Sequence, residues 1–218
     1  MIRLRRKGRR IMKDEMDILK EVGNTAAAHG SIALSEILGK KIKLYLPVAE
    51  IIPCKNIEKP IPQEGMSMTL QTQLLSGLEG KIVFVLEERQ AYKLIDICYT
   101  GEGVKKTGVF TEMGMSLIKE VGNVVIASYI SALGFFLKKL IVPSLPMLIN
   151  APFQEIIKLV VAGYGEQDYI LVVESVFEES ESKIRGTFWL LLTPDSVKEI
   201  KEACKKLLEQ VGENGGGN

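Results

Sequence analysis

Two long stretches of the chain have the apolar spacing of amphipathic helices. From about Lys13 to Leu38, apolar residues fall on one broad arc when successive residues are placed about 100° apart. A second stretch, ending near Leu137, follows the same rule, and Thr111 is its candidate N-cap. The arc of the first stretch is formed by Ile18, Leu19, Val22, Ala26, Ala33 and Ile37. The pattern predicts two helices, each with one apolar face.

The opposite arcs of these helices hold polar and small residues. In the first helix they lie within about 60° of one another, and they are Asp17, Glu21, Asn24, Ala28 and Ser35. In the second helix they are Ser116, Glu120, Asn123 and Ala127. Gly23 stands in mid-helix, where glycine costs about 1 kcal/mol relative to alanine. We therefore expect the glycine and the nearby alanines to give clearance to a docking partner.

The remaining pattern predicts strands and two shorter helices. The strand-like segments are 42–52, 66–75, 81–86, 145–151, 155–163, 169–177 and 184–192, and the helices are 89–99 and 194–212. Thr193 and Pro194 suit the N-cap and first position of the last helix. Polar residues alternate through 66–75, which predicts a half-buried strand with Ser67, Thr69, Gln71 and Gln73 on its exposed face. Pro47 predicts an edge strand or a bulge.

A pentapeptide repeat divides the chain into two halves of similar plan. Lys-Glu-Val-Gly-Asn occupies residues 20–24 and returns ninety-nine residues later at 119–123. Pro47 and Pro146 each lie twenty-three residues after the asparagine of their copy. The repeat predicts one α+β domain over 13–212 with pseudo-twofold symmetry and a mixed or antiparallel sheet, and its halves are 13–108 and 109–212. Residues 1–12 are expected to form a disordered basic arm, and 213–218 a flexible tail.

Composition excludes several classes of protein. Apolar residues make up 46% of the chain and charged residues 25%, which is typical of a soluble globular protein. Three scattered cysteines and one histidine, His29, argue against a disulfide framework, a zinc site or a histidine-based triad. We read no membrane-spanning run and no signal peptide. A cytoplasmic protein without membrane insertion is expected.

The basic residues are concentrated at the start of the chain. Residues 1–13 contain seven basic groups and no acidic one, so the remainder carries a net charge of −6 within a total of +1. Such an arm can bind nucleic acid or anionic lipid, can be a disordered tail, or can precede a true translation start at Met12. Nothing beyond the arm is basic enough to form a stripe, so we expect no nucleic-acid binding.

The repeated Glu-x-x-Asn places a carboxylate and a carboxamide on one face of a helix. This pair supplies neither a nucleophile nor its base. The carboxylate can accept hydrogen bonds from a lysine of another molecule, and the carboxamide can donate to and accept from a water molecule. The pair therefore suits the hydrolysis of an already activated group such as an acyl phosphate, where positioning matters most.

At these residues the sequence resembles the CheC family of chemotaxis phosphatases. The family signature is Asp or Ser, three residues, Glu, two residues, Asn, twenty-two residues and Pro. It is met twice without a gap, by Asp17-Glu21-Asn24-Pro47 and by Ser116-Glu120-Asn123-Pro146. The resemblance covers about residues 14–212, and two motifs in one chain resemble CheC more than CheX.

The resemblance implies a CheC-like fold with both signature helices on one face of the sheet. It also implies a substrate, the phosphorylated aspartate of the response regulator CheY. Asn24 and Asn123 would orient the attacking water, and Glu21 and Glu120 would pair with the regulator's lysine. Supporting roles would fall to Asp17, Ser116, Pro47 and Pro146. Mg²⁺ would arrive on the regulator, the protein needing no cofactor of its own, and CheD would be a second partner.

Two other functions fit the same resemblance. The chain can be a binding module of the flagellar switch, like the middle domain of FliM, which resembles this fold but lacks the Glu/Asn pairs. FliY retains such pairs but adds a C-terminal switch domain. Alternatively, the protein can act chiefly as an adaptor that sequesters CheD. The decay of phosphorylated CheY in the presence of the protein separates these possibilities.

Overall fold

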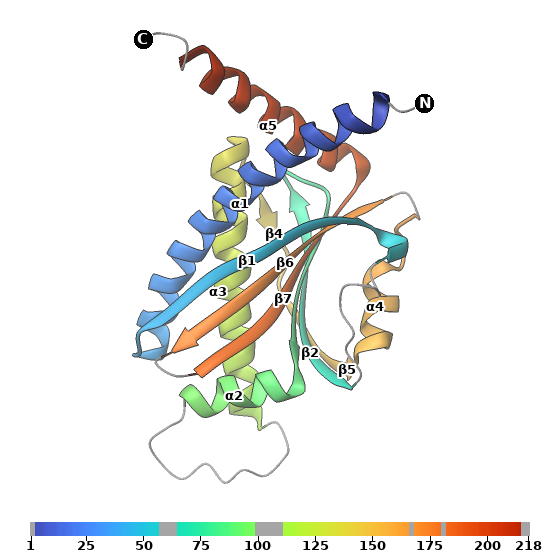
Figure 1. Ribbon diagram of the computed structural model, residues 1–218. Helices are drawn as coiled ribbons and strands as arrows, with labels where there is room; N and C mark the ends of the chain where they lie inside the picture. Colours follow the sequence, from blue (N-terminus) through green and yellow to red (C-terminus); the bar gives the residue numbers. More distant parts are fainter. Residues whose placement is uncertain (1–2, 57–64, 99–110, 166–167, 180–181, 215–218) are drawn as a thin grey trace.

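The computed structural model describes residues 3–56, 65–98, 111–165, 168–179 and 182–214 (Figure 1). Its elements in chain order are α1 (Arg3–Leu38), β1 (Ile42–Pro53), a 3-10 turn η1 (Cys54–Asn56), β2 (Met66–Ser76), β3 (Gly80–Glu87), α2 (Glu88–Cys98), α3 (Glu112–Leu137), β4 (Val142–Pro143), β5 (Met147–Pro152), α4 (Phe153–Val161), β6 (Tyr169–Glu179), β7 (Ser182–Leu192) and α5 (Pro194–Asn214). The expected tail lies outside the described residues from position 215 onward, as does the connector between the halves at 101–108.

Strand pairing confirms one sheet with internal symmetry. All pairs are antiparallel: β3 with β7 at the centre, β2 with β3, β6 with β7, β1 with β6, β5 with β2, and the two-residue β4 with β2. Exchanging β1, β2 and β3 with β5, β6 and β7 reproduces every one of these pairs except that of β4 with β2. Each half therefore lends its first strand to the hairpin of the other half, so the two halves are interlocked.

Helices cover both faces of the sheet. Along β3, Ile82, Phe84 and Leu86 belong to the core shared with α1, α2, α3 and α5, while Val83 and Val85 belong to a second core under α4. This alternation follows from the two-residue period of a strand. The long helices α1 and α3 lie together on one face (Figure 1), as the resemblance implies.

The predicted starts of two helices are confirmed. Thr111 Oγ1 accepts a hydrogen bond of 3.1 Å from the backbone N–H of Gly114 at the start of α3. Thr193 Oγ1 likewise accepts from the N–H of Ser196, and α5 begins at Pro194. No membrane-spanning run was expected, but α3 is long and apolar enough to cross a membrane by length and composition. Its apolar side chains instead pack in the core, as in a central helix of a soluble domain.

Residues 155–163, expected to form a strand, lie mostly in helix α4, so that prediction is wrong. Ile156, Ile157 and Val160 are buried at helical spacing against the far face of the sheet. The ring of Phe153 meets Trp189 edge-on, with centroids 5.8 Å apart. A short β-branched run suits a strand and a buried helix equally well, and tertiary packing decided between them.

The polar residues of β2 match the predicted exposed face only in part, since Gln73 is exposed and Gln71 is half-buried. Ser67 and Thr69 are buried on the side of the sheet where α4 packs, so the expected half-buried strand is wrong in this respect. Their hydroxyl oxygens have no hydrogen-bond partner among the described residues. The prediction assumed that one face of the sheet meets water, whereas helices cover both.

The helical boundary and the apolar arc of α1 also differ from the prediction. In the structure α1 begins at Arg3, so its backbone continues through residues expected to be a disordered arm. Leu34, absent from the predicted arc, is fully buried, and Ile37 is 45% exposed. The domain boundaries proposed from the repeat stay predictions.

Two serines of α1 cover the free edge of β1. Ser31 Oγ accepts a hydrogen bond of 2.7 Å from the N–H of Leu44, and Ser35 Oγ accepts one of 2.9 Å from the N–H of Ile42. The same hydroxyls lie within hydrogen-bond distance of the carbonyl groups of these two residues. Ser35, expected on the polar arc, therefore blocks an edge that could pair with another chain.

Candidate functional site

The first polar motif is exposed on α1. Asp17, Glu21 and Asn24 all face solvent. The amine of Lys20 lies 3.9 Å from Asp17 Oδ1, a loose pair on one helical face. In the part of the chain that the structure describes, the side chains of Glu21 and Asn24 make no hydrogen bond or ion pair. Both are therefore available to a partner molecule.

The second motif occupies the equivalent stretch of α3. Ser116 and Glu120 are exposed, and Asn123 is half-buried. Over the described ranges, no interaction holds the side chain of Glu120 or Asn123 either. The structure thus places each Glu/Asn pair together on its own helix, and α1 and α3 lie on the same face of the sheet (Figure 1).

The repeated glycine packs inward, which corrects its expected role. Gly23 and Gly122 are both buried. A Cβ at Gly122 would lie 2.7 Å from Leu70 Cδ2 and 3.3 Å from Phe84 Cδ1. The surface that approaches this glycine is the protein's own sheet, not a docking partner. Ala28 and Ala127 are exposed beside the motifs, as a clear polar stripe requires.

Both motif prolines lie where an edge strand is interrupted. Pro47 falls in the register break of β1 between Tyr45 and Val48, which confirms the predicted edge or bulge. Pro146 falls between the end of β4 and the start of β5, at the opposite side of the sheet. Here Ser144 Oγ accepts from the N–H of Gln73 on β2. Among the described residues, the sheet has no further strand on its outer side at either place, so a proline there, which lacks a backbone N–H, interrupts the hydrogen bonding of an edge strand only.

A wide groove adjoins the first motif. It has a volume of about 1010 Å³ and runs between α1 and the end of α3. Asp17 and Glu21 contribute to one wall, and Phe135, Lys138 and Leu140 contribute to the other. The groove therefore joins an acidic wall, which carries part of the motif, to a wall with an apolar and a basic component.

Sequence reasoning missed the second wall of this groove. Aromatic residues in apolar stretches usually lie in the core, and Trp189 is fully buried, but Phe135 is 86% exposed. The helical spacing could have predicted the exposure of Phe135, because Ala127, Ser131 and Phe135 are four residues apart and share one exposed face. The polar stripe of α3 thus ends in an exposed phenylalanine.

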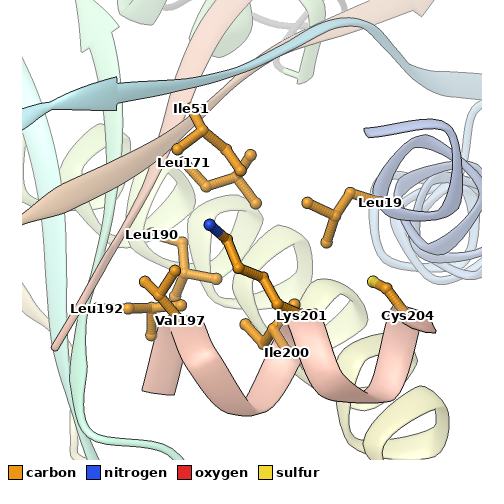
Figure 2. A pocket seen from close by; sticks show the side chains of 9 residues that line it. All are labelled: Leu19, Ile51, Leu171, Leu190, Leu192, Val197, Ile200, Lys201 and Cys204. Atoms are coloured by element: carbon orange, nitrogen blue, oxygen red, sulfur yellow. The ribbon is translucent and has the colours of Figure 1, made fainter. Parts of the chain in front are cut away.

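A second cavity, between α1, α5 and the sheet, is too small to be a binding site. It has a volume of about 30 Å³, roughly the space of one water molecule. Figure 2 shows the amine of Lys201 directed toward aliphatic side chains such as Leu171 and Leu190, with Cys204 at one end. This cavity is an imperfection of apolar packing.

The structure favours neither thiol chemistry nor a metal centre. Burial, followed by the nearby charge of Asp168, raises the pKa of the Cys54 thiol to about 11, so the thiol is protonated at neutral pH and a poor nucleophile. Burial also raises the pKa of Tyr164 to about 12. Within the described residues, no three His, Cys, Asp or Glu side chains are grouped to hold a metal ion. The Glu/Asn pairs remain the groups best placed for chemistry.

Comparison with known proteins identifies relatives over most of the chain. No protein-family model matches. The chain is 26% identical over 208 residues to the CheY-P phosphatase CheC of Bacillus subtilis. The aligned region covers 87% of this chain and 93% of that protein. The match covers most of both chains, so the relationship extends beyond the short signature.

Solved structures agree with this relationship. The crystal structure of Thermotoga maritima FliY superposes with a TM-score of 0.72 at 25% identity, covering 88% of this chain and 96% of that one. The middle domain of FliM from H. pylori superposes with a TM-score of 0.63 at 12% identity, covering 88% of this chain and 98% of that domain. The second likeness concerns the fold alone.

Proposed function

We propose that the chain is a member of the CheC/FliY family of chemotaxis proteins and a phosphatase that hydrolyses the aspartyl phosphate of the response regulator CheY. The observation that carries the proposal is the pair of unengaged Glu/Asn motifs at equivalent positions of two packed helices, exposed except for the half-buried Asn123. Each pair can enter the active site of a docked regulator without first breaking an interaction of its own.

The carboxamides of Asn24 and Asn123 hold the attacking water in line with the phosphorus atom. Water attacks phosphorus, the bond from phosphorus to the aspartyl oxygen breaks, and the products are inorganic phosphate and the free carboxylate. Glu21 and Glu120 accept hydrogen bonds from a lysine of the regulator and fix the docking geometry. Correct placement of the water lowers the barrier by about 2–3 kcal/mol, roughly a hundredfold in rate.

The other partners in this proposal follow from family membership. Mg²⁺ belongs to the regulator, where it neutralises the phosphoryl oxygens, and this chain's residues supply only positioning and charge. CheD is a further proposed partner, and titration of purified CheD into the protein by calorimetry tests that part separately. The proposed location is the cytoplasm, where such a regulator is phosphorylated.

The experiment is the decay of phosphorylated CheY with and without the protein. We expect faster decay with the wild type, slower decay with Asn24→Ala and with Asn123→Ala, and the spontaneous rate with both substitutions together. Gln154→Ala, an exposed change on α4 at the opposite face of the sheet, serves as control and keeps the wild-type rate. Unchanged decay with the wild-type protein would falsify the phosphatase proposal.

A switch-module function has one observation in its favour, the superposition on the FliM middle domain. That likeness concerns only the fold, which catalytic and non-catalytic proteins share. The two complete motifs favour catalysis. A double asparagine variant that retains full phosphatase activity would remove both proposed sites and leave the binding role as the better account.

A further inference from the structure

The internal repeat allows the surroundings of the two sites to be compared position by position. With the offset of ninety-nine residues, Phe135 corresponds to Glu36 and Leu140 corresponds to Lys41. Phe135 is 86% exposed and Leu140 is 81% exposed, and both line the groove of the first site. The two motifs are alike, but the positions that are apolar in the wall opposite the first motif are charged in the other half of the repeat.

The helices α1 and α3 run in opposite directions, so the end of each helix lies toward the motif of the other. Phe135 and Glu36 therefore occupy equivalent places relative to the two motifs. The middle of α1, at Asp17 and Glu21, shares a groove with the end of α3. Closer to the end of α1, Gly30 lies against Ser128, since a Cβ there would be 3.3 Å from the Ser128 hydroxyl. The end of α1, with Glu36, therefore continues toward the start of α3 and the second motif.

Lys138 adds a second asymmetry to the same wall. It ends α3 with φ 55°, and its counterpart Gly39 ends α1 with φ 60°. Glycine adopts this left-handed conformation at no steric cost, whereas lysine is strained in it. The second half of the repeat thus has a strained lysine in the groove, at a position where glycine would adopt the same backbone conformation without strain. Strain of this kind is a recognised mark of functional positions.

We propose that Phe135, Lys138 and Leu140 form a docking wall for the phosphorylated regulator at the first site, so that this site binds the regulator more tightly than the second. The inference rests on the proposed phosphatase function. A regulator whose aspartyl phosphate reaches Glu21 must cover the groove, because Asp17 and Glu21 form its opposite wall. The exposed ring and leucine meet an apolar patch of the regulator, and the amine of Lys138 attracts its anionic phosphorylated site.

The test separates the two sites by using single-site variants. In the Asn123→Ala background, where only the first site works, Phe135→Ala is expected to raise KM for phosphorylated CheY about tenfold and to leave kcat unchanged. In the Asn24→Ala background, the same substitution leaves both constants unchanged. Ser131→Ala, an exposed change one turn earlier on α3, is the matched control. If Phe135→Ala changes KM by the same factor in both backgrounds, or changes it in neither, the proposal is overturned.

Lys138→Gly tests the strain argument independently of Phe135. Glycine relieves the left-handed strain, so the variant is expected to unfold at the same or a higher urea concentration than the wild type. Its KM at the first site is nevertheless expected to rise several-fold. A variant that gains stability without any rise in KM shows that Lys138 does not take part in docking.

Binding without hydrolysis distinguishes failure of this inference from failure of the proposed function. CheY activated with beryllofluoride, a stable mimic of the phosphoryl group, is titrated into wild type and Phe135→Ala. Weaker binding of the variant supports the docking wall even if the wild type has no phosphatase activity. If Phe135→Ala instead converts a dimer to a monomer in sedimentation and leaves regulator binding unchanged, the wall belongs to self-association and the proposal fails.

Discussion

The two motif-bearing helices share the Glu/Asn pair of the motif but differ in the residues that surround it. Each helix carries Glu and Asn one turn apart with a buried glycine between them, and all but the half-buried Asn123 are exposed at these polar positions. The prolines, ninety-nine residues apart, both interrupt an edge strand. The walls facing the motifs differ, with Phe135 and Leu140 at one site and Glu36 and Lys41 at the counterpart positions.

This difference separates the requirements of chemistry from those of recognition. Orienting a water molecule needs a carboxamide in one fixed position, so the polar pair and the helix that holds it are the same in both copies. Docking energy can come from any complementary surface around that position, so the surrounding wall can change without loss of chemistry. Two sites with one mechanism can therefore differ in affinity.

The largest expected effect comes from filling the space at the repeated glycine. Gly122→Val places methyl groups into Leu70 and Phe84, and we expect it to lower the free energy of unfolding by about 3 kcal/mol. Ala127→Val, on the exposed side of the same helix, should change it by less than about 0.5 kcal/mol. Urea denaturation measures both. Wild-type stability in Gly122→Val would show that the glycine is not a packing residue.

The two edge strands provide the next comparison. Ser31→Ala removes the hydroxyl that serves the N–H and carbonyl groups of Leu44, and we expect a loss of about 2 kcal/mol. Ser144→Ala at the opposite edge removes the acceptor for the N–H of Gln73, an exposed group that water can satisfy. Its cost should be about 1 kcal/mol or less. Equal losses in thermal denaturation would mean that α1 does not protect its edge in the manner described.

A smaller effect is expected to distinguish Asn24 from Asn123. If the first site binds more tightly, Asn24→Ala should lose more activity than Asn123→Ala when phosphorylated CheY is scarce, by up to about tenfold, or 1.4 kcal/mol. At saturating regulator, the two variants should have similar rates, because each retains one intact Glu/Asn pair. The rate of phosphate release over a range of CheY concentrations checks this. Curves that coincide at all concentrations would show that the sites are equal.

The sequence predicted the elements of the fold more completely than their contacts. The apolar period located α1 and α3, and Thr111 and Thr193 marked helix starts because capping is a local interaction. The strand over 155–163 was wrong, since a short β-branched run does not distinguish a strand from a buried helix. The exchange of first strands between halves is a long-range pairing with no local signature.

The motifs were found in the sequence, but the groove was not. Glu21, Asn24, Glu120 and Asn123 stood out because they repeat at fixed spacing on an exposed face. Phe135 did not, since an aromatic residue in an apolar helix usually lies in the core. Its exposure depends on where α3 ends relative to α1, which is a property of packing between distant segments. The expectation that Gly23 gives clearance to a partner was wrong, because glycine carries no apolar side chain that would mark its face of the helix as buried.

The smallest expected effect concerns the one motif position at which the two copies differ. Asp17 lies 3.9 Å from the Lys20 amine, whereas Ser116 has no charge to offer Lys119. Because the Asp17 pair is exposed, Asp17→Ser should change stability by less than about 0.5 kcal/mol. If this position only tunes the charge beside the motif, Asp17→Ser and Ser116→Asp should shift the rate at their own sites by less than about twofold, in opposite directions, and the shifts should fade as salt is added. A large loss that salt does not relieve would instead show that Asp17 contacts the regulator directly.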